Sequence, residues 1–289
     1  MTFAIKLTGT CTDTTLPTLE RDGLLSGSND GVRFLWDAAF PYSYAGGPPA
    51  ADALIRDISE HGDGKFARAT ADVVGFAGGG FDFSTMTATS GPTLQAVESP
   101  SNVWAGIQAE QEFMVVSYVK LPVLADWNVE TSILPIFAGG NTGTGYSTEP
   151  DPVTILLKPG NVSARRQYAI GSQAEISVAP GLHYGLVTQV AFWREGGGAN
   201  QVGLRLKSAA GSTLSLGTAA TLNAADFSAV KARWGSVPPF TTYNLATHRT
   251  ARNRRHYRGW VEDLSISGRN PETVLDADWL RVVARGVFS

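Results

Sequence analysis

The longest regular pattern of apolar positions lies in the last third of the chain. Between Leu182 and Arg194, apolar residues fall on both sets of alternate positions, which predicts a long strand. The glycines at 196–198 then provide a turn, and residues 202–207 alternate strictly between apolar and other residues. Such alternation is typical of a strand with one face on the core and the other in water. The two segments together predict an antiparallel hairpin.

Shorter apolar segments precede this hairpin, and most stop at glycine or proline. Residues 113–121 are apolar on both strand faces and β-branched in the middle, which predicts a central strand. Many short strands separated by turns are more typical of an antiparallel sandwich than of helices. The other predicted strands are residues 32–36, 53–59 (strand or short helix), 81–83 (with both Phe rings on one face), 133–137 and 153–157.

Only the C-terminal segment has a helical pattern. Asn270 is a favourable N-cap, and Pro271 fits the first helical turn. We expect a small helix that closes one end of the sandwich. The apolar residues that recur at the spacing of one helical face are Leu275, Trp279, Val282 and Val283.

The beginning of the chain lacks a sustained period. Residues 1–35 are rich in Thr, Gly, Ser and Asp, with short apolar pairs such as Leu24-Leu25. They are interpreted as an extended arm or attachment segment, either an ordinary irregular terminus or an arm that orders against a partner protein. The remaining residues, 36–289, are predicted to form the sandwich.

Composition narrows the functional classes. With 289 residues and 43% hydrophobic content, the chain can bury a substantial core. The formal net charge of −3 gives no global field for nucleic acid or anionic lipid. Cys11 is the single cysteine, so no intrachain disulfide can form. No apolar run approaches ~18 residues and no secretory signal is recognisable, so we expect cytoplasmic synthesis and no membrane insertion.

The order of these elements resembles the jelly-roll sandwich of concanavalin A-like lectins and laminin G-like domains. Residues 183–192 and 259–267 carry the resemblance, the second as a closing strand that leads into a short helix. It extends from about residue 81 to residue 280. It implies an all-β jelly-roll β-sandwich of two antiparallel sheets with a short C-terminal helix, a scaffold rather than a chemistry.

The closing segment, residues 257–269, is also similar to sequences in bacteriophage virion proteins, chiefly tail or fibre components with a lectin-like domain. Residues 6–10, followed by Leu16-Pro17 and Arg21-Asp22, are similar to the beginnings of such proteins. This resemblance implies a location in the virion with other virion proteins as partners. Because particle proteins are used in many copies and fibres are often threefold, we expect a homo-oligomer, with a trimer favoured.

A search for catalytic groups gives mostly negative results. Retaining glucanases on this scaffold place two carboxylates at alternate positions of one strand, as Glu-x-Asp-x-x-Glu or Glu-x-Asp-x-Glu, and no such string occurs here. Glu262 and Asp263 are neighbours, so a strand directs them to opposite faces, one into solvent and one to a bond near a loop. We therefore predict no catalytic residue and no enzymatic activity.

Metal binding is not predicted either. The four histidines lack metal-ligand spacing and are expected at the surface or in loops: His61, His183, His248 and His256. Calcium is bound by related jelly rolls through loop oxygens. The oxygen-bearing candidates here form no dense cluster in the sequence: Asn141, Glu149 and Asp151 in one loop, and Asp57, Asp63 and Asp82 elsewhere. No cofactor and no metal site are therefore predicted, and a structural calcium ion is the alternative.

Two features are candidates for binding. Sugars are held by an aromatic ring against their C–H face and by polar groups on their hydroxyls. Trp127 with Asn128, and Tyr146 with Asn141, are such pairs, although rings of this kind also pack over sandwich edges. The second feature is a basic contact patch, or alternatively a solvated loop, formed by Arg249, Arg252, Arg254, Arg255 and Arg258 together with His256.

The sequence thus predicts a non-enzymatic bacteriophage virion structural protein, in a tail, fibre or head-decoration role. Its lectin-like domain is expected to contact host-surface glycan or neighbouring subunits, without binding nucleic acid. The alternatives are a bacterial carbohydrate-binding lectin or glycoside-active enzyme on the same fold, and a structural spacer that contacts no sugar.

Overall fold

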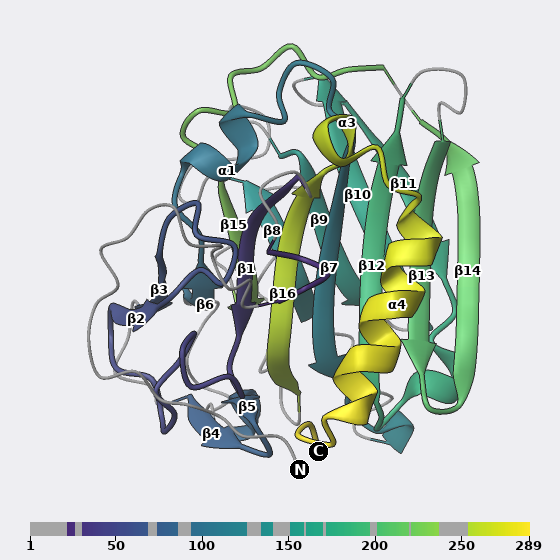
Figure 1. Cartoon of the computed structure of the whole chain (residues 1–289). Coiled ribbons are helices and arrows are strands. Elements are labelled where there is room, and N and C mark those ends of the chain that lie inside the picture. The colour runs from purple at the N-terminus through teal and green to yellow at the C-terminus, as the bar shows by residue number, and fades with distance from the viewer. Residues whose placement is uncertain are drawn as a thin grey trace.

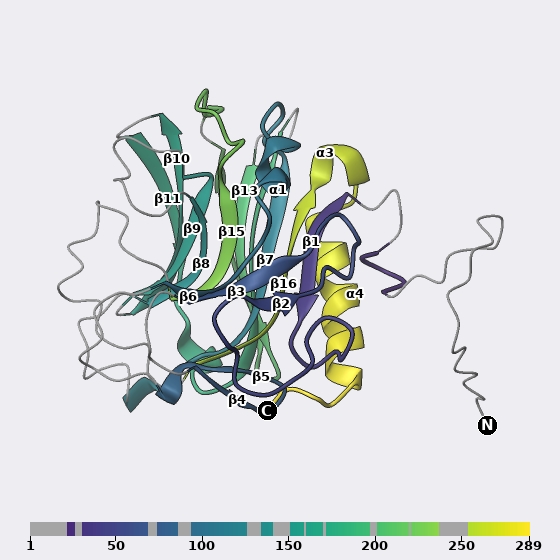
Figure 2. The same ribbon diagram turned by 90° about the vertical axis from the view of Figure 1, so that its left-hand side faces the viewer.

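The chain folds into two antiparallel sheets that face each other, with a helix on the outer face of one of them (Figures 1 and 2). The predicted all-β sandwich is therefore confirmed. The computed structural model describes residues 22–26, 31–68, 74–85, 94–125, 134–140, 151–158, 160–169, 172–196, 201–219, 221–236 and 254–289. No helix within these ranges is long and apolar enough to span a membrane.

The front sheet in Figure 1 has the strand order β14-β13-β12-β7-β16-β5-β4, and β1 pairs with β16 beside β5. Its strands are β1 (Val32–Asp37), β4 (Gly75–Ala77), β5 (Gly80–Asp82), β7 (Phe113–Lys120), β12 (Val187–Glu195), β13 (Gln201–Ser208), β14 (Gly211–Thr218) and β16 (Arg255–Asp263).

The back sheet has the order β11-β10-β9-β8-β15-β6-β3-β2. Its strands are β2 (Ala53–Ile55), β3 (Gly64–Arg68), β6 (Gln95–Glu98), β8 (Leu134–Gly140), β9 (Val153–Lys158), β10 (Asn161–Ala169), β11 (Ser172–Val178) and β15 (Lys231–Ser236). The helices are η1 (Phe83–Thr85), α1 (Asn102–Ala105), η2 (Gly181–His183), α3 (Leu264–Ser267) and α4 (Pro271–Ala284).

The strongest strand predictions are confirmed. β7 lies between β12 and β16, and its first seven residues are buried, as expected for a central strand. β12 and β13 form the predicted antiparallel hairpin. In the segment 53–59 only the first three residues are a strand. In the predicted strand 81–83, Phe81 lies in β5 but Phe83 lies in η1. Both rings are buried in the inter-sheet core.

The inter-sheet core is organised around Trp234 of β15. Its ring lies 5.0 Å from the Phe137 ring and 5.8 Å from the Phe34 ring, centroid to centroid. Its Nε1 donates to the carbonyl oxygen of Val116 at 2.9 Å, which joins the two sheets. A Cβ on Gly259 would lie only 2.3 Å from that nitrogen, so glycine on β16 makes room for the ring.

The position of helix α4 differs from the prediction. It begins at the predicted cap, where Asn270 accepts from the Thr273 N–H, but it lies along the outer face of the front sheet instead of closing an end (Figure 1). There it covers a second apolar cluster. Val283 was predicted on the same helical face as Leu275, but it is 54% exposed and does not belong to the buried face. The buried face consists of Pro271, Val274, Leu275, Asp278 and Val282.

The same helix changes the environment of β13. Its outer face was expected to meet water, but Arg205 on that face is buried and donates to Asp276 of α4 at 2.9 Å. The inner face contacts the core as expected, through Leu204 and Leu206. The helix therefore makes this sheet buried on both sides along β12 and β13.

The N-terminal boundary also differs from the prediction. The boundary between residues 35 and 36 falls inside β1, which pairs with β16. Upstream of it, Leu25 is buried and Asp22 contacts Arg258. The sandwich therefore includes residues 22–26, and the part of the predicted arm before residue 22, with Cys11, lies outside the described residues.

Candidate functional site

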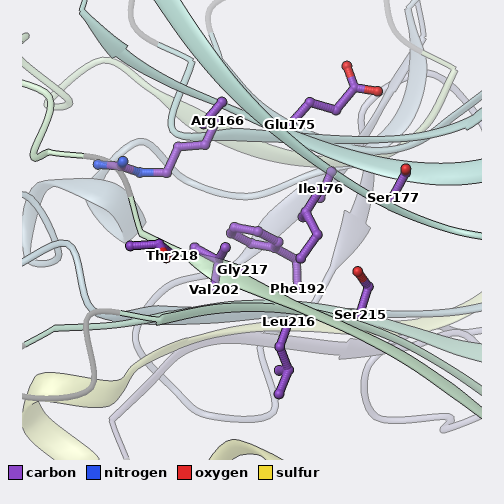
Figure 3. Close-up of a pocket in the computed structure, with 12 residues that line it drawn as sticks. Arg166, Glu175, Ile176, Ser177, Phe192, Val202, Ser215, Leu216, Gly217 and Thr218 are labelled. Carbon is purple, nitrogen blue, oxygen red and sulfur yellow. The ribbon is translucent and has the colours of Figure 1, made fainter.

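A cavity of about 370 Å³ lies between the sheets, at the side where β11 and β14 are both edge strands (Figure 3). Strands β10 and β11 form one wall, and β13 and β14 form the other. We call it the inter-sheet groove. The residues that define its middle are Ala164, Ile176, Phe192, Val202, Ser215 and Gly217.

The register of the strands explains why the groove is open. Ser215 pairs with Leu204, and Leu204 is buried in the inter-sheet core, so Ser215 faces inward. By the same rule Gly217, which pairs with Val202, also faces inward. On the opposite wall Ala164 pairs with Ile176. Since small residues occupy inward positions on both walls, their side chains leave the volume between the sheets unfilled.

The middle of the groove is apolar with a polar group at one side. In Figure 3, Ile176 extends from β11 towards Phe192, and the Ser215 hydroxyl points into the space between the walls. Leu216 and Glu175 point away from that space. The groove thus offers an apolar surface and a hydroxyl to a small ligand.

One end of the groove is cationic. Arg166 of β10 donates to Gln111 Oε1 at 2.6 Å and to the carbonyl oxygen of Thr221 at 2.9 Å. Arg194 of β12 donates to the carbonyl oxygens of Glu110 and Gln111. Burial, with the neighbouring charge of Arg194, lowers the pKa of Arg166 to about 10. A pKa of about 10 still leaves this guanidinium charged at neutral pH, so the groove ends beside a positive group.

The residues that line the inter-sheet groove include no pair of carboxyl groups. Glycoside hydrolysis usually needs two carboxyl groups, one on each side of the glycosidic bond. Glu175, the carboxylate among the groove residues, is bonded on the outer face to Lys158 and Arg165. Within the same described ranges, no three His, Cys, Asp or Glu side chains are grouped so that they could hold a metal ion.

Glu262 and Asp263 are placed differently from the prediction, because both are buried. Glu262 accepts from Arg269 Nε at 2.9 Å. Asp263 accepts from Arg33 at 2.8 Å and also caps α3. Each carboxylate therefore has an arginine partner and a structural role, and neither is the solvated one that was expected.

The oxygen groups considered for calcium are occupied by the protein where the structure describes them. The Asp57 carboxylate accepts from the backbone N–H groups of Leu35, Ser59 and His61. Asp82 accepts from Arg255 Nε at 3.0 Å. These bonds hold loops in place. Asn141 and Glu149 lie outside the described residues.

The predicted sugar-binding residues cannot be placed in this geometry. Trp127, Asn128, Asn141 and Tyr146 all lie outside the described residues, and their role stays a prediction. The groove, in contrast, was missed by the sequence reasoning. Its signal was the alternation of leucine with small residues in Gly211–Thr218, which indicates a strand with one small face.

The basic contact patch requires a correction. Arg254 and Arg258 are 1% and 2% exposed, so neither is available for a surface contact. Arg255 is partly exposed and pairs with Asp82 and with the C-terminal carbonyl oxygen of Ser289. Arg249 and Arg252 lie outside the described residues. Arg258 is buried because it lies on β16, which is central in the front sheet, and Arg254 directly precedes that strand.

Arg258 is the centre of a buried ionic cluster. Its guanidinium lies 2.9 Å from Asp22, 3.2 Å from Asp37 and 3.0 Å from Asp278. Burial opposes its charge, but the three carboxylates outweigh burial and raise its pKa. Burial also opposes the charge of Asp22 and by itself would raise the pKa of this carboxyl. Arg258 and Arg281 outweigh burial and bring the pKa to about 2. This cluster joins the residue 22 segment, β1, β16 and α4.

Two histidines are in the interior and not at the surface as expected. His183 is buried, and its ring nitrogens lie 2.9 Å from Ser208 Oγ and 3.0 Å from Thr213 Oγ1. His256 is buried beside Arg254, and burial, with that positive charge, lowers its pKa well below the usual value. His61 is exposed, and His248 lies outside the described residues.

Comparison with known proteins gives a structural result only. The chain matches no protein-family model and no curated protein. Its fold is similar to the binding domain of botulinum neurotoxin serotype D/C, at 10% identity and a TM-score of 0.50, over 81% of this chain and 49% of that one. The serotype C1 binding domain gives 10% identity and a TM-score of 0.47, over 81% and 49%.

The binding domain of botulinum neurotoxin DC in complex with rat synaptotagmin II gives 10% identity and a TM-score of 0.48, over 83% of this chain and 51% of that one. This chain therefore spans about half the length of these binding domains. The resemblance to bacteriophage virion proteins stays a prediction. At 10% identity, what the similarity to the serotype D/C domain shows is a shared β-sandwich fold.

Proposed function

We propose that this protein is a non-enzymatic β-sandwich of a bacteriophage virion and that it binds carbohydrate in the inter-sheet groove. The observation that carries the proposal is the groove itself, which combines an apolar middle with a hydroxyl and a cationic end. A sugar ring has the matching chemistry, because one face presents C–H groups and its edge presents hydroxyls.

The size of the groove limits the ligand. At about 370 Å³ it is at the lower end of the range for small-molecule sites, so it accepts a short saccharide unit and not a long chain. Phe192, Val202 and Ile176 would contact the ring, and Ser215 would bond a hydroxyl. The charge of Arg166, whose terminal nitrogens donate to Thr221 and Gln111, favours a sugar that carries a carboxylate through its field and not through a direct bond.

The placement in a virion is supported by the sequence resemblance in residues 257–269, which form most of β16, α3 and the turn that follows. The chain needs no disulfide, since the described sandwich is held by two apolar clusters and buried ion pairs. The protein of similar fold is described as a binding domain, which agrees with a binding role.

A glycan array combined with a hydrolysis assay tests the proposal. Gly217→Val fills the groove, because a Cβ at residue 217 already lies 3.4 Å from Val202 Cγ2 and 3.6 Å from Ile176 Cδ1. We expect this variant to lose the glycans that the unmodified protein retains. Ser212→Val, at an exposed outward position of the same strand, is the matched control and should keep them.

Three results would contradict the proposal. Turnover of a polysaccharide would show an enzyme, and an array without any bound glycan would favour a structural spacer. Retention of binding by Gly217→Val would move the site away from the groove, for example to the loops that carry Trp127 and Tyr146. The virion assignment is tested separately by electron microscopy of the native particle with an antibody against this chain.

A further inference from the structure

We infer that the free edge of β14 is an interaction surface for a second copy of this chain. In this arrangement two β14 strands pair antiparallel about a twofold axis at Ser215, and the front sheets of both copies become one continuous sheet. The inference goes beyond the proposed function, because it concerns the assembly of the protein and not its ligand.

The edges of the two sheets are not equivalent. β1, which pairs with β16, also leaves an edge, but Leu35 on it donates to Asp57 and accepts from the Ile58 N–H. β4 and β2, which end the sheets on one side, have three residues each. β11 has seven residues, but Glu175 on it is engaged in ion pairs with Lys158 and Arg165. Short strands and charges are the usual means by which proteins protect sheet edges from further pairing.

β14 lacks this protection. It has eight residues, Gly-Ser-Thr-Leu-Ser-Leu-Gly-Thr, without charge or proline. Within the described part of the chain, β13 is its pairing partner and its other side ends the sheet (Figure 1). Regular pairing with β13 along the whole strand keeps it extended, so its outer backbone groups are presented in a row.

The outward side chains of β14 are apolar and exposed. Leu214 and Leu216 are 38% and 49% exposed. Leu214 pairs with Arg205, whose guanidinium lies under α4 on the outer face, so both leucines are on that face. The helix crosses β12 and β13 and leaves β14 uncovered (Figure 1). These leucines therefore form an apolar strip along an unprotected edge.

The strip is self-complementary, and this argues for a second copy as the occupant. With the axis at Ser215, Leu214 of one copy lies opposite Leu216 of the other, and the reverse pair forms by symmetry. Thr213 lies opposite Gly217, and Ser215 meets its own equivalent. Apolar cross-strand pairs stabilise such a contact, and no charge is buried or opposed.

The expected affinity is moderate. Eight residues give a shared edge of roughly 26 Å. Such a strip is small beside the roughly 1,600 Å² of a standard stable interface, so we expect self-association at about micromolar concentration. Where many copies are held together, as in a particle, the effective concentration would strengthen the contact. The pairing would also set two inter-sheet grooves side by side, since Ser215 and Gly217 line them from within.

Sedimentation equilibrium of the full chain over a range of concentrations tests the inference. We expect a reversible monomer–dimer equilibrium for the unmodified protein. The double variant Leu214→Lys/Leu216→Lys should be monomeric, because lysines then oppose lysines, and so should Leu214→Glu/Leu216→Glu. An equimolar mixture of the two should dimerise again. Leu280→Lys, at a 69% exposed leucine of α4, is the control and should not change the equilibrium.

Cross-linking tests the register. Ser215→Cys in a Cys11→Ser background should form a disulfide-linked dimer on mild oxidation, because the two positions would face each other at a Cα separation of about 5 Å. Ser212→Cys in the same background should stay monomeric, since residue 212 is expected opposite residue 218. Both positions are partly or fully exposed, so folding is checked simply by circular dichroism.

Several outcomes would overturn the inference. They are a protein that is monomeric at all concentrations, a trimer, or a dimer that the charged double variants leave intact. Loss of the dimer on removal of residues 1–21 would identify that segment as the occupant of the edge and would also overturn it. Glycan binding by the monomeric variants, scored on the same array, shows separately whether the groove proposal holds.

Discussion

Single residues with buried charge determine how the sandwich is held together. Arg258 meets three carboxylates, and one of them, Asp22, is 236 positions away in the chain. We expect Arg258→Ala to lower the free energy of unfolding by about 3–5 kcal/mol, because it leaves buried carboxylates without their counter-ion. Urea denaturation followed by tryptophan fluorescence measures this loss.

The control for that substitution is an exposed ion pair. Lys65 lies 2.7 Å from Asp52, with side chains 46% and 70% exposed. Lys65→Ala should cost less than about 1 kcal/mol, since water screens such pairs. Equal losses for the two variants would contradict a structural role for the Arg258 cluster.

A second prediction at this scale concerns Asp151 and the dependence of stability on pH. Its carboxylate oxygens both lie 2.9 Å from Thr154 Oγ1, and burial raises its pKa from 3.8 to about 7. Between pH 4 and pH 7 the unfolded chain releases this proton while the folded chain keeps it, so raising the pH lowers stability. The penalty is absent below about pH 4 and complete above about pH 7.

Asp151→Asn should therefore stabilise the protein at pH 8 and have little effect at pH 4. The measurement is the free energy of unfolding of both proteins at the two pH values. Asp52→Asn removes one exposed carboxylate and serves as the control for net charge. A variant that is equally stable relative to the parent at both pH values would show that the Asp151 pKa is not raised.

At the scale of elements, helix α4 depends on its first turn. The Asn270 side chain accepts from the Thr273 N–H at 3.0 Å, which satisfies one of the free donors at the helix start. Asn270→Ala should lower the free energy of unfolding by about 1 kcal/mol, and Asn270→Ser should recover most of it. Thermal denaturation of the three proteins checks this, and an unchanged midpoint for Asn270→Ala would contradict it.

The same helix shows how far sequence patterns extend. Local signals predicted its cap and the β12–β13 hairpin, because both depend on residues close together in the chain. They did not predict that Asp278 is buried and Val283 exposed, since Asp278 is held by Tyr118 and Arg258. A spacing pattern indicates a helical face but not the surface on which it packs.

The inter-sheet groove was not predicted for a related reason. It depends on Ala164 and Gly217, which belong to different sheets and face one volume only after the sandwich has formed. A small residue in a sequence does not reveal whether a larger neighbour fills the space beside it. In contrast, the sandwich fold could be predicted from the sequence, because the alternation of apolar residues and the turns are properties of neighbouring residues in the chain.

At the scale of the whole molecule, the beginning of the sandwich decides which part of the chain can be removed. Leu25 is buried, Asp22 binds Arg258, and β1 pairs with β16 from Val32 onward. A protein that begins at residue 22 keeps all these contacts, so its thermal midpoint should equal that of the full chain within a few degrees.

A protein that begins at residue 36 loses most of β1, including the buried Phe34 and Leu35, together with Asp22. Loss of one large core side chain alone costs about 2–5 kcal/mol, which is comparable to the total stability of many domains. We therefore expect this shorter protein to be unfolded or insoluble. Differential scanning calorimetry of both deletions distinguishes the two boundaries. If the protein that begins at residue 36 unfolds cooperatively near the midpoint of the parent, the domain begins at residue 36, as the sequence predicts.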